Sequence, residues 1–487
     1  MLYTATWDSV SQHALPQWYD DAKFGMFVHW GLYSVPAWSP TGYSAMQVVT
    51  GKAPPTYQDI PDGAFYFNNL NIPNSQTRAY HDKTYGANFA YDEFVPLFNA
   101  AIETWDPDAM ADFLRDCGAH YVVLTTKHHE GFLMWNARVR NPFKPNYVAT
   151  RDVLGELSNA VRARGMKMGA YYSGGFDWTF NATPIRELSD VLRAMPQSKE
   201  YVAYVLAHFH DLMERYEPAV LWNDIGMPAN LNLPQLFADY YNAVPEGVVD
   251  DRYAQYSLGE LTNVLTSPPF ARVLSQIMDK EFGGGAPPST VKHADFTTPE
   301  YTTYHNIVAK KWEATRGIGH SFGYNRNEAP DDYMTVPQLV QFVADVVSKN
   351  GNVLLNVGPQ ADGTIPQIEQ ERVRGLGAWL KLNGEAIYGT RPWTRAEGNA
   401  QANGKTLDAR FTRNGESMYA IVFASDAPRE ILVQDVDAPH IANVALLGSA
   451  AQVTWRANEN DLFVTLPDFP DADTRAETFA LKLTMKR

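Results

Sequence analysis

The stretch AVLWNDIG, residues 219–226, has the composition of a core strand that ends on a carboxylate. Six of its eight residues are of the kind that proteins bury, and only Asn223 and Asp224 interrupt the apolar run. Short runs of this type are typical of parallel strands that are covered on both faces. Gly226 and Pro228 follow, so Asp224 is explained either as a cap or turn residue or as a reacting group.

Similar apolar runs occur before and after this stretch, and helical patterns separate them. The runs begin at Lys23, Tyr121, Lys167, Gly247 and Gly351. Residues 106–119 and 151–166 have helical spacing, start with acidic or polar residues, and end at or near a glycine. Strands that alternate with helices are typical of βαβ units. The pattern predicts an α/β fold, a (β/α)8-like TIM barrel, over residues 1–390.

The pattern changes from about Arg391. Stretches such as LDARFTRNGESMYAIVFAS and NDLFVTLPDF alternate with period two, and turn residues separate them. This alternating pattern predicts a C-terminal antiparallel β-sandwich over residues 391–487. A chain of 487 residues is also too long for one ordinary core, which favours two domains.

The composition restricts the class of partner. The formal net charge is -15, so nucleic acid and anionic membrane surfaces would be repelled by the average surface. No apolar stretch approaches the length of a membrane span. The composition therefore favours a neutral or cationic ligand, with no nucleic acid and no membrane as partner, and leaves homo-oligomerisation open.

Cysteine usage and the N-terminus bear on the compartment. Cys117 is the single cysteine, which excludes a disulfide framework and fits a reducing environment. The first 25 residues lack a basic segment followed by an apolar one. We expect a cytoplasmic protein, or a periplasmic or secreted one from which a leader has been removed.

Five consecutive predicted strands end in polar or aromatic side chains. These include His29, His128, His129, Tyr171, Trp222, Asp224 and Arg252. In a parallel barrel the carboxyl ends of the strands meet on one face, where active sites form. Helix or turn caps alone do not explain five such endings, so the sequence predicts a site on this face.

The histidines in this set raise the question of a metal site. Neighbouring side chains on a continuous strand point to opposite faces, so His128 and His129 are not expected to bind one ion. His208 and His210 lie in a helical pattern, where residues two apart face away from each other. We therefore expect no metal and no cofactor. Carboxylate, histidine and tryptophan are instead suited to binding and cleaving sugars.

Several motifs, taken in order, resemble the retaining α-L-fucosidases of glycoside hydrolase family 29. They are KFGMFVHWGLYSVPAW, YVVLTTKHHEGFLMW, YYSGGFDW, LWNDIGMP and TRGIGHSFGYNRNE, and the likeness runs from about Trp18 to Trp393. The resemblance implies an exo-acting retaining glycosidase that hydrolyses terminal α-L-fucosyl linkages in oligosaccharides or glycoconjugates by double displacement. It also fits a C-terminal β-sandwich.

The resemblance assigns roles to individual residues. Asp224 matches the nucleophile. The positions that match sugar-binding residues are His29, His128, His129, Tyr171, Trp222 and Arg252, and Phe27 and Phe322 match the wall around the C6 methyl group. Glu300, in HADFTTPEY, is the best match to the acid/base. Glu260 and Glu281 remain rivals, because they lie in the stretch 256–291, which is interpreted as an insertion.

One motif departs from the family pattern. Many members carry E-W-Y after the first strand, with the Glu and Trp on the sugar hydroxyls, whereas this chain has Ala64, Phe65 and Tyr66. Phe65 and Tyr66 are still expected to bind substrate, and Asp62 is the nearest carboxylate. The departure leaves open which C3 and C4 stereochemistry is accepted. The alternatives are a glycosidase for another α-L-hexoside (α-L-galactoside or α-L-glucoside) and a non-catalytic sugar-binding protein.

Overall fold

The computed structural model describes residues 2–45, 47, 59–186, 188–255, 291–424, 428–467 and 478–486. Its N-terminal part contains a seven-stranded parallel sheet in the order β5-β4-β3-β2-β1-β7-β6. The strands are β1 (Phe24–Val28), β2 (Tyr121–Lys127), β3 (Lys167–Ser173), β4 (Val220–Asp224), β5 (Val248–Val249), β6 (Trp312–Gly317) and β7 (Gly351–Val357). All residues of β1, β2, β4 and β7 are buried, as the continuous apolar runs predict.

Residues 295–300 fill the place between β5 and β6. The backbone N–H of Asp295 donates to the carbonyl of Val249 at 3.0 Å. On the other side, residues 297 and 300 form parallel bridges to residues 312 and 315 of β6. Pro299 has no N–H, which prevents a complete ladder here. This irregular segment closes the barrel, and the predicted (β/α)8-like fold is confirmed.

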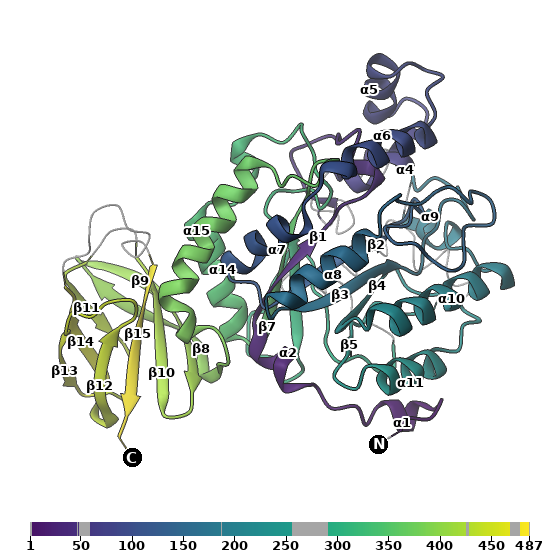
Figure 1. Ribbon diagram of the computed structural model, residues 1–487. Coiled ribbons are helices and arrows are strands. Elements are labelled where there is room, and N and C mark those ends of the chain that lie inside the picture. Colours follow the sequence, from purple (N-terminus) through teal and green to yellow (C-terminus); the bar gives the residue numbers. More distant parts are fainter. Residues whose placement is uncertain are drawn as a thin grey trace.

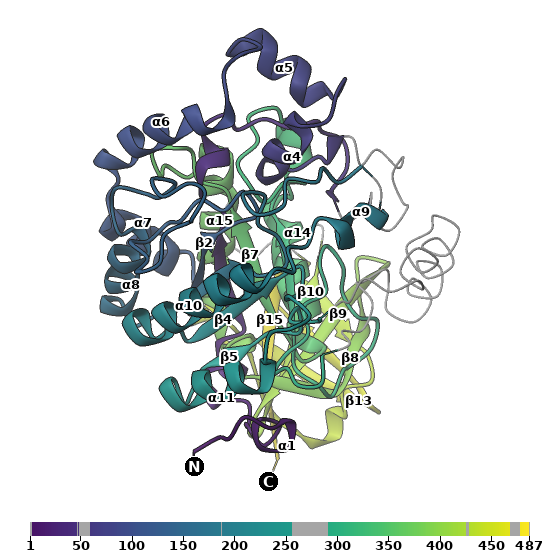
Figure 2. The same cartoon turned by 90° about the vertical axis from the view of Figure 1, so that its right-hand side faces the viewer.

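Helices connect the strands and cover the outside of the barrel (Figures 1 and 2). The two predicted helices are α7 (Pro107–Asp116) and α8 (Val153–Ala163), whose first turns are capped by Asp106 and Asp152. Among the described residues, the other α-helices are α1 (Trp7–Val10), α2 (Gln17–Ala22), α4 (Tyr66–Leu70), α5 (Gln76–Thr84), α6 (Phe94–Ala101), α9 (Leu188–Arg193), α10 (Lys199–Tyr216), α11 (Leu233–Ala243), α14 (Val336–Ser348) and α15 (Gln367–Asn383).

The C-terminal part is an eight-stranded antiparallel sheet in the order β12-β15-β10-β9-β8-β11-β14-β13. Its strands are β8 (Arg391–Ala402), β9 (Lys405–Asn414), β10 (Ser417–Phe423), β11 (Glu430–Val433), β12 (Ile441–Leu446), β13 (Thr454–Asn458), β14 (Asp461–Thr465) and β15 (Thr478–Met485). The sheet folds over its own apolar core, which confirms the predicted sandwich. It packs beside α14 and α15 (Figure 1), where Arg410 of β9 donates to Asp345 of α14 at 2.7 Å.

Candidate active site

Asp224 is the last residue of β4, and its carboxylate is held by three donors. Its Oδ2 accepts a hydrogen bond from the Tyr171 hydroxyl at 2.8 Å. Its Oδ1 accepts from the backbone N–H of Ile225 at 2.9 Å and from Arg252 Nη1 at 3.0 Å. The helix that follows, α11, is capped by Asn232 instead. A helix cap therefore does not explain Asp224.

Arg252 joins this carboxylate to a second one. While Nη1 donates to Asp224, Nη2 donates to Glu300 Oε2 at 2.9 Å. Its Nε donates to the Thr298 hydroxyl at 2.9 Å, and the guanidinium lies 4.8 Å from the centre of the Trp222 ring. The end of β4, the loop after β5 and the closing segment 295–300 therefore meet at one guanidinium.

Glu300 has the environment of a general acid. Its side chain is 13% exposed. Burial raises the pKa of Glu300 above its ordinary value, Arg252 opposes this shift, and the charge of Asp224 adds to it. A carboxyl group with a raised pKa keeps its proton at a higher pH, which suits proton donation. Its sequence rivals, Glu260 and Glu281, lie outside the described residues.

Three histidines line the same end of the barrel. His29 follows β1, and its Nδ1 lies 2.6 Å from Asn356 Oδ1. His128 and His129 follow β2, their ring centres are 3.9 Å apart, and His129 Nε2 lies 4.0 Å from Asp224 Oδ2. The expectation that these two rings point to opposite faces was wrong. The strand ends at Lys127, so the alternation of a strand does not apply to them.

The hydrogen bonds of His129 fix its tautomer. The Ser173 hydroxyl donates its proton to the Phe176 carbonyl, so it must accept from His129 Nδ1, which lies 2.7 Å away. Burial lowers the pKa of His129 well below its usual value, and the ring is therefore neutral. This leaves Nε2, on the side of Asp224, as an acceptor for a hydroxyl group.

Aromatic rings form the base of the site. The Tyr171 and Trp222 rings are stacked with centres 5.5 Å apart, and Phe27 lies 5.1 Å from Trp222. Phe322 lies 4.9 Å from His29 and 6.5 Å from Phe27. An apolar wall therefore adjoins the carboxylates and histidines.

Comparison with known proteins shows which family this chain belongs to. The family model described as Alpha-L-fucosidase matches residues 1–385. This chain belongs to the alpha-L-fucosidase family. The family is one of glycoside hydrolases, and the resemblance inferred from the sequence motifs is confirmed.

Relatives match over almost the whole chain. The plasma alpha-L-fucosidase of Rattus norvegicus is 32% identical over 477 residues, which are 96% of this chain and 90% of the relative. The alpha-L-fucosidase of Dictyostelium discoideum is 31% identical over 92% of this chain and 86% of its own length. A crystal structure of Thermotoga maritima alpha-fucosidase with a mechanism-based inhibitor is 37% identical, with a TM-score of 0.80 over 99% of this chain and 100% of that one.

The segment that departs from the family pattern adds one predicted residue to the site. The Phe65 ring lies 5.2 Å from His129. Tyr66 points elsewhere: its hydroxyl lies 2.9 Å from His81 Nδ1, and its ring contacts Tyr91 and Phe94. Phe65 ends a 3-10 turn and Tyr66 begins α4, so the two rings leave the backbone in different directions. The structure contradicts the expectation for Tyr66.

Asp62 does not replace the missing carboxylate either. Its Oδ1 accepts from the N–H groups of Ala64 at 2.8 Å and Gly323 at 3.2 Å, and its Oδ2 accepts from the N–H of Phe322 at 3.1 Å. These bonds tie the loop before α4 to the loop after β6. Asp62 therefore supports the wall that carries Phe322, and its Oδ1 also accepts from the Ser321 hydroxyl at 3.2 Å.

Sequence reasoning missed two polar residues that support the site. Asn356 in β7 accepts through Oδ1 from His29 Nδ1 at 2.6 Å and donates through Nδ2 to the Phe322 carbonyl at 2.7 Å. Glu313 in β6 accepts from Trp222 Nε1 at 3.1 Å and from the Tyr19 hydroxyl at 2.7 Å. Both interrupt buried strands, and an isolated polar residue in such a strand is the signal that could have found them.

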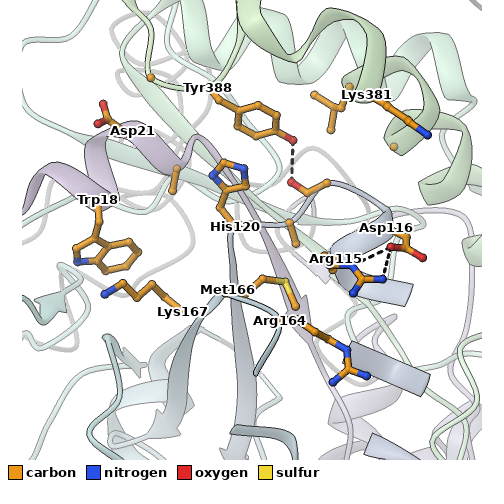
Figure 3. Close-up of a pocket in the computed structure, with 17 residues that line it drawn as sticks. Trp18, Asp21, Arg115, Asp116, His120, Arg164, Met166, Lys167, Lys381 and Tyr388 are labelled. Atoms are coloured by element: carbon orange, nitrogen blue, oxygen red, sulfur yellow. Dashed lines mark hydrogen bonds and ion pairs between the residues drawn. The ribbon is translucent and has the colours of Figure 1, made fainter. Parts of the chain in front are cut away.

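A cavity with a volume of about 1170 Å³ lies at the other end of the barrel, where β2 and β3 begin. Figure 3 shows Trp18, His120 and Tyr388 around it, together with Arg115 and Asp116, which are bonded to each other. None of the predicted site residues lines this cavity. Its size alone does not make it the reaction site.

Among the described residues, one group of three side chains has atoms close enough for a metal, namely His13, His293 and Asp295. These are not the histidines that follow the strands. His13 already uses both nitrogens, with Nδ1 2.8 Å from Asp295 and Nε2 3.3 Å from the Pro245 carbonyl. The group is accounted for by its own hydrogen bonds.

Proposed function

We propose that the protein is an exo-acting retaining α-L-fucosidase in which Asp224 is the nucleophile and Glu300 is the acid/base. The observation that carries this proposal is the single guanidinium of Arg252, which bonds both carboxylates at the strand ends of the barrel. Retaining glycosidases need two carboxyl groups close together on either side of the glycosidic bond, with one of them able to donate a proton.

In the first step an oxygen of Asp224 attacks the anomeric carbon, and the bond from that carbon to the leaving-group oxygen breaks. Glu300 gives its proton to the departing oxygen, so the aglycone leaves as an alcohol. In the second step Glu300 takes a proton from water, the water oxygen attacks the anomeric carbon, and the ester bond to Asp224 breaks. Two inversions give retention.

The electrostatics of Glu300 suit both of its roles. The charge of Asp224 raises the pKa of Glu300 while the nucleophile is free. Once Asp224 is esterified, that charge is absent, and the attraction of Arg252 favours the ionised form of Glu300. The same residue can therefore donate a proton in the first step and accept one in the second.

We propose that the sugar lies among the side chains gathered around Asp224. His29, His128 and His129 bond its hydroxyl groups, with His129 Nε2 as an acceptor. Phe27 and Phe322 face the C6 methyl group, and a hydroxymethyl group there would bury a hydroxyl without a partner. Tyr171, Trp222, Arg252 and Phe65 complete the site. Tyr66 is left out because its hydroxyl is bonded to His81.

We propose that the substrate is a terminal α-L-fucosyl residue of an oligosaccharide or glycoconjugate. Among the described residues, no helix combines the length and the apolar character needed to cross a membrane. We further propose that the catalytic domain ends near residue 390, since the first strand of the antiparallel sheet begins at Arg391.

The proposal is tested by proton NMR of the first-formed sugar from 4-nitrophenyl α-L-fucoside. The α-anomer is expected, and initial formation of the β-anomer would mean inversion and a different pair of residues. A panel of aryl α-L-glycosides tests the substrate, with the α-L-fucoside expected to have the highest kcat/KM. A higher value for an α-L-galactoside or α-L-glucoside would keep the mechanism and change the specificity.

A further inference from the structure

The turn directly after Asp224 has an unusual backbone. Ile225 has a φ of 64° and Gly226 has a φ of 98°. Glycine adopts such angles freely, but a β-branched residue in the left-handed region is a strained outlier. Strain of this kind persists only where the surroundings impose it, and it is concentrated at functional sites.

Contacts with neighbouring backbone and with the Asn223 side chain hold this turn in place. The N–H of Gly175 donates to the Asp224 carbonyl at 3.1 Å. A β-carbon on Gly175 would lie 2.5 Å from the Ile225 carbonyl oxygen, so only glycine lets the two chains approach this closely. Asn223 Nδ2 donates to the carbonyls of Gly226 at 3.0 Å and Arg252 at 2.8 Å. The turn is thereby tied to the residue that bonds both carboxylates.

The Ile225 side chain holds the turn from the outside. It is half-buried and packs against an apolar cluster that lies apart from the barrel core. The buried members of that cluster are Phe176, Trp178, Ile185, Ala194 and Met195. An apolar side chain on this cluster opposes rotation of the strained peptide back to an ordinary strand conformation.

The turn begins with a peptide whose N–H group reaches the proposed nucleophile. The Asp224–Ile225 peptide donates its N–H to Asp224 Oδ1 at 2.9 Å instead of continuing the hydrogen bonds of the strand. Together with Arg252 Nη1 on the same oxygen, it fixes the rotation of the carboxylate about its last bond.

We propose that Ile225 is a positioning residue for the nucleophile: its side chain anchors the left-handed turn, and with it the Asp224–Ile225 peptide whose N–H donates to Asp224 Oδ1. This inference rests on the proposed role of Asp224. It requires that removing the anchor lower the rate of the reaction more than the binding of the sugar, because Phe27, Tyr171 and Trp222 belong to a different cluster from the one against which Ile225 packs.

The experiment compares Ile225→Ala with Ile225→Leu as a matched control. Alanine keeps a β-carbon in the left-handed region and removes the anchor, whereas leucine keeps an apolar side chain of similar volume. With 4-nitrophenyl α-L-fucoside, kcat of Ile225→Ala is expected to fall by about 10- to 100-fold while KM changes by less than about threefold. Ile225→Leu is expected to keep kcat within about threefold of the wild type.

Circular dichroism and thermal unfolding separate positioning from a loss of folded protein. An Ile225→Ala variant with wild-type kcat would overturn the inference, and so would a fall in kcat that matches the unfolded fraction. If Ile225→Ala does not fold, Ile225→Val shortens the anchor and is expected to lower kcat to a smaller extent. An active Asp224→Ala variant would instead overturn the proposed function. An inactive Asp224→Ala variant beside a fully active Ile225→Ala variant would overturn only this inference.

Discussion

The two ends of the barrel differ in how far their paired charges are exposed to solvent. At the end where β2 and β3 begin, Arg115 bonds Asp116 (Figure 3) and Arg164 bonds Asp112, and the side chains of these two carboxylates are 67% and 45% exposed. At the other end Arg252 bonds Asp224 and Glu300, whose side chains are only 11% and 13% exposed. Exposed ion pairs stabilise a fold modestly, whereas charges held together out of solvent are typical of sites that do chemistry.

The same comparison shows that the volume of a cavity does not identify the reaction site. The cavity at the first end is large, with a volume of about 1170 Å³, but the cations Arg115 and Arg164 beside it have carboxylate partners of their own. At the second end, His129 Nε2 lies 4.0 Å from Asp224 Oδ2, and Arg252 holds the carboxylates of Asp224 and Glu300 together. Mutations at the two ends should therefore have very different effects on turnover.

The largest effect is expected for Asp224→Gly. Without the nucleophile the glycosyl-enzyme cannot form, and kcat for 4-nitrophenyl α-L-fucoside should fall by about 10⁴-fold or more. Azide should restore turnover by attacking from the vacated space, which gives the β-fucosyl azide. The fold should be retained, because Asp224 lies at the end of β4 and outside the apolar core. Rate assays with and without azide, together with circular dichroism, provide the check.

Wild-type turnover in Asp224→Gly would show that Asp224 is not the nucleophile. It would also contradict the expected difference between the two ends of the barrel. Loss of activity without rescue by azide, in a folded variant, would assign Asp224 to binding instead of attack.

The next largest effect concerns Glu300→Gln. Poor leaving groups need a proton, so kcat/KM for a fucosylated disaccharide should fall by about 10²- to 10⁴-fold, and that for an activated aryl fucoside much less. Because the pKa of Glu300 is raised, the wild-type activity on the disaccharide should decline toward alkaline pH only above the ordinary carboxyl range. That decline should be absent in the variant. Equal losses on both substrates would direct the search to Glu260 or Glu281.

The arrangement of the proposed catalytic end was predictable from sequence wherever the backbone itself fixes the position of a residue. His29, Asp224 and Arg252 follow apolar runs, and parallel strands bring their carboxyl ends to one face. Tyr66 was not predictable in this way. The direction of the Tyr66 ring depends on His81, which lies fifteen residues away on α5 and forms a hydrogen bond with the Tyr66 hydroxyl.

The same distinction explains the residues that were missed. Glu313 acts on Trp222 across the barrel interior, through a hydrogen bond that joins two strands 91 residues apart. Hydrophobic periodicity identifies the strand that contains Glu313 but says nothing about which side chain its carboxylate meets. The left-handed conformation of Ile225 could not be predicted either, because backbone sterics disfavour a β-branched residue in that conformation.

A smaller effect is expected for Phe65→Trp. The Phe65 ring lies 5.2 Å from His129, and the family pattern places a tryptophan in the corresponding motif. An indole N–H directed at a sugar hydroxyl adds one hydrogen bond, which is typically worth about 0.5–1.5 kcal/mol and should lower KM for the fucoside by about 2- to 10-fold. Phe65→Leu, which has no donor, is the control and should not lower KM. An unchanged KM for Phe65→Trp would mean that this ring does not face the sugar.

The smallest effect on activity is expected for His120→Ala at the other end of the barrel. The His120 ring is stacked on Tyr388 with centres 4.2 Å apart, and burial lowers its pKa, so a neutral ring contributes packing there. Loss of such a contact typically costs about 0.5–1.5 kcal/mol, which should lower Tm by a few degrees or less. Because no substrate contact is removed, kcat and KM should both stay within about twofold of the wild type. A change in KM without a change in Tm would contradict the comparison, since it would connect the cavity to the substrate and show that the paired charges around it serve more than the fold.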